Sequence, residues 1–407
     1  MTAPLPHGQT PDAVLGHLRS AYTEDFPFAE LLRDPLPGGA GQRAHDAADL
    51  LLLDTLATWS EVGHRLDPVV VLDDRHGALT LPLLKAGVAV RLGQDSASHQ
   101  RSVTRNAERV GDRVRSDHLL TRGEIGPELL AGARTVVLPL PRSLDALDQT
   151  AHLVAEHAHV DVVLLAGGRD KHMSPRMNEV LSRSFTSVVA GRGRSKSRVI
   201  TARGSRRGRP APFPRTRAQE LPDVGSVTLA AYGATFGGAR LDPGTRLLLE
   251  AMAAAVHSGT LTTERAIDLG CGNGTIALWL ALQWAGLSVL ATDQSADACR
   301  SAELTARENG VLDRVEIRRD DALSSVDEAS EPLVVLNPPF HDGNAVDPGV
   351  AQRLIAEAAR VLEDGGQLWC VWNSHLRYRP LLERLVGQTR QVARNRQFTV
   401  TVSSRRR

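Results

Sequence analysis

The fold class is indicated first by the stretch Arg265-Ala266-Ile267-Asp268-Leu269-Gly270-Cys271-Gly272-Asn273-Gly274-Thr275. Residues Arg265–Leu269 predict a strand, and the pattern from about Thr275 predicts a helix. Glycines between them permit a tight turn and let the backbone approach a ligand, while the start of a helix offers free N–H groups. Dinucleotide sites and other cofactor sites share such a turn. The stretch therefore predicts an α/β fold with a cofactor site, and leaves the cofactor open.

Two acidic turns follow this stretch. The next expected strand, Leu287–Ala291, leads to Asp293, at the place where folds of this kind carry a ribose-binding carboxylate. A helix N-cap would account for Asp293 equally well on its own. The second acidic turn is Asp320-Asp321-Ala322, after a third expected strand. On their own these acids do not identify a site, but together with the Gly-rich turn they point to a cofactor site.

The most distinctive stretch is Asn337-Pro338-Pro339-Phe340, which ends the apolar run Leu333–Leu336. The run predicts a buried parallel strand, and two prolines cannot extend it. Asn337 is therefore expected in a stiff turn at the carboxyl end of a strand, where open α/β sheets bind ligands. An amide acceptor, free carbonyls and an aromatic face suit a planar group that carries an exocyclic NH2. This pattern points to methylation of a nitrogen.

The chain contains this pattern of segments twice, about 200 residues apart. In the first copy, Pro68–Leu72 predicts a strand, Leu79–Lys85 a helix and Val88–Leu92 the next strand. Three later segments of the first copy stand opposite segments of the second: Thr135–Leu138 opposite Leu333–Leu336, Asp161–Leu165 opposite Gln367–Val371, and Ser197–Ala202 opposite Gln397–Val402. Alternating strands and helices predict a largely parallel sheet with helices on both faces. The predicted fold class is α/β, with two tandem Rossmann-like domains.

The first copy lacks the chemical residues of the second. The pairs of opposing residues are Val71 and Asp268, Asp73 and Gly270, Arg75 and Gly272, Gly93 and Asp293, and Pro139-Leu140-Pro141 and Asn337-Pro338-Pro339. The apolar framework is retained in both copies. The first copy is therefore predicted to be a degenerate domain, which has the fold without the site. We expect it to dock RNA together with the basic linker, and the alternative is that it only shields and stabilises the catalytic domain.

These patterns divide the chain into four parts. An irregular extension over 1–44 precedes the degenerate domain over 45–205, and a Pro/Arg-rich linker over 206–225 leads to the catalytic domain over 226–407. Ten Lys/Arg and no acid lie between Gly191 and Arg217. Such a cluster suits contact with an RNA backbone, and a solvated charged segment explains it as well.

The composition, with 42% hydrophobic and 23% charged residues, is that of a soluble globular protein. No apolar run reaches the length of a membrane span and the first residues lack a signal pattern, so no membrane association and a cytoplasmic location are expected. The three cysteines, Cys271, Cys299 and Cys370, show no paired spacing, and no disulfide or metal site is expected. We expect a monomer.

Taken together, these stretches resemble the class I S-adenosylmethionine-dependent methyltransferases, and within them the RsmC/RlmG group of ribosomal RNA guanine-N2 methyltransferases. The stretches that carry the resemblance are Asp268–Gly274, Asn337-Pro338-Pro339-Phe340-His341 and Phe236…Leu241-Asp242-Pro243-Gly244. The tail Asn373–Tyr378 looks most like the large-subunit RlmG branch. That group carries a degenerate N-terminal methyltransferase-like domain, and the resemblance covers nearly the whole chain after residue 44. One departure is Gly237-Gly238-Ala239-Arg240, where the family commonly has a Ser-Arg pair.

The resemblance implies a role for each residue of the site. Asp268, Gly270, Gly272 and Gly274 would hold the methionine part of S-adenosylmethionine, with Cys271 and Asn273 in the same turn. Asp293 would hold the ribose, and Asp321 would lie against the adenine. Asn337, also expected beside the cofactor, and the Pro338 carbonyl would accept hydrogen bonds from the guanine amine of ribosomal RNA. Pro339 belongs to the same rigid turn, and Phe340 would stack on the base.

Two other functions remain open at this point. A site that binds an NH2 group does not distinguish guanine N2 from adenine N6, cytosine N4 or the amide of a protein glutamine. A non-catalytic RNA-binding factor for ribosome assembly would use both copies as scaffold. The acids and glycines retained in the second copy favour the enzyme, because the first copy shows a sequence that has lost them.

Overall fold

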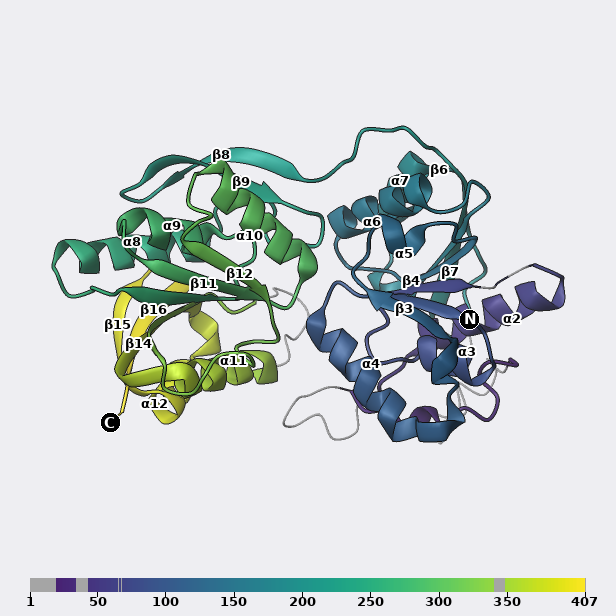
Figure 1. Cartoon of the computed structure of the whole chain (residues 1–407), viewed down its shortest axis with the longest axis horizontal. Coiled ribbons are helices and arrows are strands. Elements are labelled where there is room, and N and C mark those ends of the chain that lie inside the picture. The colour runs from purple at the N-terminus through teal and green to yellow at the C-terminus, as the bar shows by residue number, and fades with distance from the viewer. Residues whose placement is uncertain (1–19, 34–42, 65, 67, 340–347, 407) are drawn as a thin grey trace, which may run out of the picture. The chain divides into compact units, whose positions relative to one another are not determined.

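The computed structural model describes residues 20–33, 43–64, 66, 68–339 and 348–406. They form two compact units, the first ending at Pro212 and the second beginning at Phe213. Each unit contains one seven-stranded sheet with helices on both faces (Figure 1). Within the described residues, no helix is long and apolar enough to cross a membrane. The α/β fold with two tandem Rossmann-like domains is confirmed.

The two sheets have the same strand order. In the first unit it is β3 (Leu119–Gly123), β2 (Val90–Gly93), β1 (Val69–Leu72), β4 (Thr135–Pro139), β5 (Val163–Arg169), β7 (Ser197–Ser205) and β6 (Phe185–Ala190). In the second it is β12 (Val315–Arg319), β11 (Ser288–Asp293), β10 (Arg265–Leu269), β13 (Glu331–Leu336), β14 (Leu362–Asn373), β16 (Phe398–Arg405) and β15 (Gly387–Arg394). Five strands of each sheet run parallel, and the last two pair antiparallel. The shared order supports the duplication.

Helices connect the strands and cover both faces of each sheet. The helices of the first unit are α2 (Ala47–Glu61), α3 (Thr80–Lys85), α4 (Ala97–Val110), α5 (Pro127–Leu130), α6 (Leu144–His157) and α7 (Pro175–Ser184), with short 3-10 turns at Phe28–Glu30, Gly111–Arg113, Ser116–His118 and Asp170–His172. The helices of the second are α8 (Pro243–His257), α9 (Thr275–Gln283), α10 (Ala296–Glu308), α11 (Pro348–Val361) and α12 (Arg379–Leu385), with a 3-10 turn at Ser374–Leu376.

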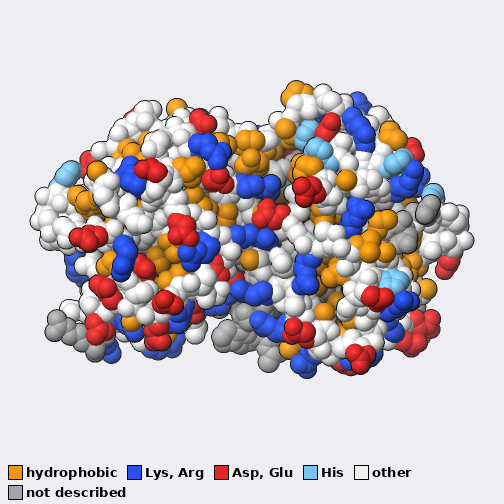
Figure 2. Space-filling model, viewed as in Figure 1, with side chains coloured by type: hydrophobic (Ala, Val, Ile, Leu, Met, Phe, Trp, Pro, Cys, Tyr) orange, Lys and Arg blue, Asp and Glu red, His pale blue; other side chains and the backbone are white. Residues whose placement is uncertain are grey.

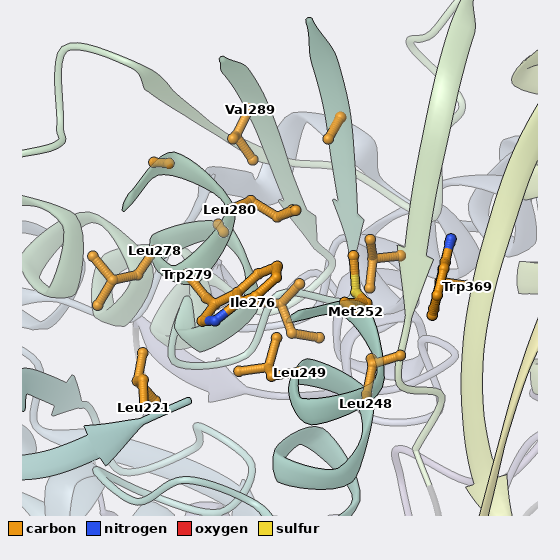
Figure 3. Close-up of a cluster of buried hydrophobic side chains, with 14 of the residues drawn as sticks. Leu221, Leu248, Leu249, Met252, Ile276, Leu278, Trp279, Leu280, Val289 and Trp369 are labelled. Atoms are coloured by element: carbon orange, nitrogen blue, oxygen red, sulfur yellow. The ribbon is translucent and has the colours of Figure 1, made fainter. Parts of the chain in front are cut away.

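Each sheet separates two apolar cores, because successive side chains of a strand point to opposite faces. In the second unit Leu333 and Val335 of β13 face one core, and Val334 and Leu336 face the other. The first of these cores contains side chains of α8, α9 and α10. Figure 3 shows the buried Trp279 of α9 in the same cluster as Leu249 and Met252 of α8. Burial on both faces explains why the strands are continuous apolar runs.

The backbone hydrogen bonds correct one expected correspondence between the copies. Asp73 N donates to Gly93 O, and Gly270 N donates to Thr292 O. Gly93 therefore stands opposite Thr292, and the counterpart of Asp293 is Gln94 rather than Gly93. The expectation was wrong by one residue because a period of 200 was applied where the spacing is 199.

Two segments expected to be irregular contribute to the units. Tyr22, Phe26 and Leu31, from the extension over 1–44, are buried in the core of the first unit. Residues 215–221, placed in the linker over 206–225, form β8 (Arg215–Leu221), which pairs with β9 (Gly225–Ala231) in a hairpin. The alternation of polar and apolar residues along β9 could have predicted this hairpin. The Pro/Arg-rich composition led instead to the prediction of a linker.

Strand β9 and the residues that follow it are also hydrogen-bonded by side chains of α10 and of its C-cap, Asn309. The backbone N–H groups of Thr228, Ala230, Tyr232 and Ala234 donate to side-chain oxygens of Asn309, Thr305, Ser301 and Asp297, over 2.9–3.0 Å. The acceptors recur every fourth residue on the helix, and the donors every second residue on the extended chain. Polar residues on this face of α10 are therefore explained by the strand they satisfy.

Most of the ten basic residues between Gly191 and Arg217 have partners inside the protein. Their contacts are Arg194 with Asp54, Arg198 with Asp170 and Gly191 O, Arg203 over the Trp59 ring, Arg206 with Phe185 O, Arg207 with Ala158 O, Arg209 with Arg183 O, and Arg215 over the Phe213 ring. On the face seen in Figure 2, basic and acidic side chains are interspersed. Most of these basic residues therefore contact the protein itself but remain exposed, and their contact with an RNA backbone stays a prediction.

Candidate active site

The Gly-rich turn after β10 has a backbone that favours glycine. Gly270, Gly272 and Gly274 have φ angles of 78°, 54° and 76°. A β-carbon on Gly270 or Gly272 would meet no atom within 4 Å, so the backbone is open to a ligand at these positions. A β-carbon on Gly274 would lie 2.8 Å from Ala302 Cα. The third glycine therefore allows the turn to pack closely on α10.

Asp268, the fourth residue of β10, is completely buried. Its Oδ2 accepts a hydrogen bond of 2.9 Å from Ala277 N in the first turn of α9. Its Oδ1 is buried and has no hydrogen-bond partner. Burial raises the pKa of Asp268 to about 7, against the Ala277 hydrogen bond and with a further contribution from the charge of Asp293. A cationic ligand would favour the ionised form of this carboxyl group.

Asp293 links the Gly-rich turn to the start of α10. Its Oδ2 accepts from Gly272 N at 3.0 Å and its Oδ1 from Ser295 N at 2.9 Å. The N-cap of α10 is Ser295, whose hydroxyl accepts from Ala298 N, so the N-cap interpretation of Asp293 was wrong. Burial raises the pKa of Asp293, and the hydrogen bonds from Ser295 and Gly272 oppose this.

Asn273 and Cys271 lie in the same turn with their side chains directed into the protein. Asn273 Nδ2 donates to Gly238 O and Arg240 O at 2.9 and 3.0 Å, and its Oδ1 accepts from the Thr275 hydroxyl. Asn273 therefore ties the segment Gly237–Arg240 to the turn. Cys271 packs in the apolar core, where burial raises the pKa of its thiol well above the usual value.

The acidic turn after β12 is held by local contacts and by α11. Asp320 accepts from the backbone N–H and the hydroxyl of Ser325. Asp321 is buried, and its Oδ1 lies 2.6 Å from Arg353 Nη2. Arg353 was not singled out from the sequence, since an arginine on an amphipathic helix carries no local signal of its partner. The adenine contact of Asp321 stays a prediction.

Asn337 follows β13, and its side-chain amide has a fixed orientation. Its Nδ2 donates to Asp242 Oδ2 at 3.1 Å and to Thr245 Oγ1 at 2.8 Å. Because an ionised carboxylate only accepts hydrogen bonds, the atom facing Asp242 is the NH2 group. Asn337 Oδ1 is buried and has no hydrogen-bond partner. The site thus offers a buried acceptor whose direction is set by two neighbours.

Asp242 carries out two tasks at the start of α8. The same Oδ2 that accepts from Asn337 also accepts from Thr245 N at 2.9 Å, which makes Asp242 the N-cap of the helix. Leu241-Asp242-Pro243-Gly244 entered the sequence analysis only through resemblance. The structure gives Asp242 a physical role, which is to orient Asn337.

Replacing Asp242 by alanine is expected to lower the rate of methyl transfer about 100-fold, because Asn337 loses the partner that orients it. Loss of the N-cap costs about 1 kcal/mol of stability in addition. Asp242→Asn should recover most of the rate, since asparagine also caps helices and also offers an oxygen acceptor. Single-turnover rates at saturating cofactor measure both variants. Equal rates for the two variants would refute the orienting role.

The remaining residues of the tetrapeptide are only partly described. Pro338 is buried and Pro339 is exposed. Phe340 and the following His341 lie outside the described residues, so the predicted stacking on the base stays a prediction. Among the described residues, no group of three or more His, Cys, Asp or Glu side chains is arranged to hold a metal ion.

Comparisons with known proteins show the family of this chain. The family described as "Methyltransferase small domain" matches residues 226–402, and the family described as "RLMG N-terminal domain" matches residues 20–206. A "Ribosomal RNA large subunit methyltransferase G" of Streptomyces coelicolor is 34% identical over 88% of this chain and 93% of its own length. The chain belongs to the ribosomal RNA large subunit methyltransferase G family.

Other similar proteins extend the comparison. A ribosomal RNA large subunit methyltransferase G of Pseudomonas aeruginosa is 31% identical over 92% of this chain and 97% of its own length. Among solved structures, the T. thermophilus 16S rRNA N2 G1207 methyltransferase (RsmC), in complex with AdoMet and guanosine, superposes with a TM-score of 0.74. It is 23% identical and the match covers 93% of this chain and 99% of that chain, so the likeness shows the two-domain fold.

As a member of the methyltransferase G family, the protein is an S-adenosylmethionine-dependent methyltransferase. The site fits this cofactor, which supplies an electrophilic methyl group on a cationic sulfonium. The open backbone at Gly270 and Gly272 leaves room for it, and the unpartnered Oδ1 of Asp268 offers a negative charge to its cationic groups. Asp293 would hold the ribose hydroxyls.

Proposed function

We propose that this protein transfers the methyl group of S-adenosylmethionine to the exocyclic N2 amine of a guanine in large-subunit ribosomal RNA. The observation that carries the proposal is the Oδ1 of Asn337, a buried acceptor without a partner at the carboxyl end of β13. Named relatives of the family act on ribosomal RNA of the large subunit. The protein fixes the acceptor before substrate binds, so little reorganisation accompanies the reaction.

The chemistry requires such an acceptor because a guanine amine is a poor nucleophile. Its lone pair is delocalised into the ring, and the nitrogen gains positive charge as the bond to the methyl carbon forms. An oxygen that accepts a hydrogen bond from the amine stabilises that charge. A second acceptor, the carbonyl of Pro338, would bind the other proton. Positioning and electrostatics then account for catalysis without a metal or a covalent intermediate.

The proposal is tested with ribosomal RNA from cells that lack the protein. The purified enzyme and labelled S-adenosylmethionine should form N2-methylguanosine at one position. Replacement of that guanosine by inosine, which lacks only the N2 amine, should abolish transfer to the RNA. Formation of N6-methyladenosine, N4-methylcytidine or methylated protein glutamine instead would contradict the proposal and identify the alternative substrate. An absence of any transfer would favour the non-catalytic assembly factor.

A further inference from the structure

The degenerate first unit contains a cavity at the carboxyl ends of β1, β4 and β5. Its volume is about 290 Å³, and its lining includes Arg75, Pro139, Arg142 and Arg169. The corresponding edge of the second sheet carries the Gly-rich turn and Asn337. The cavity thus lies where the first copy would have its active site, and it has been kept although the catalytic residues have been lost.

Several replacements relative to the second copy introduce arginine into this cavity. Counted from the paired strands, Arg75 stands at the position of Gly272 and Arg169 at that of Asn373. Arg142, three residues after Pro139, corresponds to position 340. Three neutral positions on three different strand ends have therefore become cationic, and their side chains converge on one space.

The charge of the cavity is positive overall. Six Arg or Lys side chains line it against three Asp, with the six being Arg33, Arg43, Arg75, Arg142, Arg169 and Lys171. The three acids are engaged by backbone N–H groups: Asp74 by Gly77, Leu79 and Thr80, Asp46 by Ala48 and Asp49, and Asp49 by Asp46. Burial and then Asp46 raise the pKa of Asp49 to about 8, which weakens its negative charge further.

Three histidines also line the cavity. The pKa values of His45, His76 and His172 are lowered, first by burial and next by neighbouring arginines. Two buried nitrogens in the cavity wall, Arg169 Nε and His45 Nδ1, have no hydrogen-bond partner. Across the described residues, no ion pair or side-chain hydrogen bond involves Arg75, Arg142, Arg169 or Lys171. A bound anion would satisfy these groups.

We propose that this cavity binds the phosphate group of a nucleotide, either within an RNA chain or as a free mononucleotide. Arginine forks match phosphate oxygens in geometry and charge, and the volume admits a phosphate with part of its nucleoside. The degenerate copy thereby recognises a phosphate with the part of the fold that holds substrate in the active copy. The inference rests on the proposed function only in its choice of RNA as one source.

The test measures binding of uridine, uridine 5′-monophosphate and hexauridylate to the full chain by titration calorimetry. These probes contain no guanine, so the site around Asn337 has no amine to recognise. The monophosphate should bind at least about tenfold more tightly than uridine, and Arg169→Met and Arg142→Gln should each remove about tenfold of that affinity. Hexauridylate binding more tightly than the monophosphate identifies RNA as the source, and equal binding identifies a free nucleotide.

Arg176→Gln is the matched control, because Arg176 is exposed on α7 of the same unit and does not line the cavity. An equal loss of affinity in this control, or unchanged binding in the cavity variants, would overturn the inference. Arg169 is partly buried, so Arg169→Met can disturb the fold. Arg142 is exposed, so Arg142→Gln keeps the fold and tests the cavity in that case. Methyl transfer to guanine is assayed separately, so phosphate binding without transfer would sink the proposed function and leave this inference standing.

Discussion

Asn337→Ala is expected to lower the rate constant of methyl transfer by about 100- to 1000-fold while the affinity for S-adenosylmethionine changes little. The estimate follows from the loss of one preorganised group that stabilises developing charge. The NH2 group of Asn337 is held by Asp242 and Thr245, and only its Oδ1 is left for a substrate. Single-turnover rates and cofactor titrations on the same preparation separate the two effects.

Two further variants sharpen this result. Asn337→Asp keeps an oxygen acceptor but places a second carboxylate against Asp242, so it should also be strongly impaired. Asn178→Ala, on α7 of the first unit, is a control for asparagine replacement and should transfer methyl at the normal rate. Near-normal turnover by Asn337→Ala would remove Asn337 from the catalytic machinery.

Asp268→Asn is expected to weaken cofactor binding and to abolish its dependence on pH. The pKa of Asp268 is raised to about 7, so the carboxyl group is largely protonated at pH 6 and must lose its proton to pair with a cationic ligand. The affinity of the natural enzyme should therefore fall about tenfold per pH unit below 7. Asparagine has a similar shape and can still accept from Ala277 N, but its affinity should stay flat and low between pH 5.5 and 7.5.

The stability of the free protein provides a second measure of the same group. A carboxyl group whose pKa is raised by folding binds its proton more tightly in the folded state than in the unfolded state. The natural protein should therefore lose stability relative to Asp268→Asn as the pH rises from about 4 to about 7, and the difference should then remain constant. Asp313→Asn, at an exposed position, is the control. Parallel pH profiles for all three proteins would contradict the raised pKa.

The sequence predicted the elements well where the signal was local. Arg265–Leu269 was predicted with both ends correct, and the helix from Thr275 begins where expected. Continuous apolar runs and glycine turns report burial and backbone geometry directly. The counterpart of Asp293 was displaced by one residue because spacing between segments is not a local property.

The contacts that complete the site were not predictable in the same way. Asp242 lies 95 residues before Asn337, and Arg353 lies 32 residues after Asp321. No periodicity links such pairs, since the folded sheet and not the chain brings them together. The basic cluster at 191–217 shows the same limit. Composition predicted an exposed basic segment and most of its side chains are exposed, but the carbonyls and acids of the first unit that several of its arginines bind could not be predicted.

The hydrogen bonds between α10 and the chain from β9 onward fix the register of that chain along the helix. Four helical residues rise about 6 Å, and two extended residues span about 6.6 Å, so the two repeats nearly coincide over a few steps. The four polar side chains of α10 therefore set the position of the chain from Thr228 to Ala234, which leads directly into the segment that Asn273 holds. Because α10 begins just after Asp293, the same helix sets the positions of both Asp293 and the segment beside the Gly-rich turn. Inserting a single residue into α10 would rotate the side chains after the insertion by about 100° around the helix axis. These side chains would then no longer face the backbone N–H groups from which they accept hydrogen bonds.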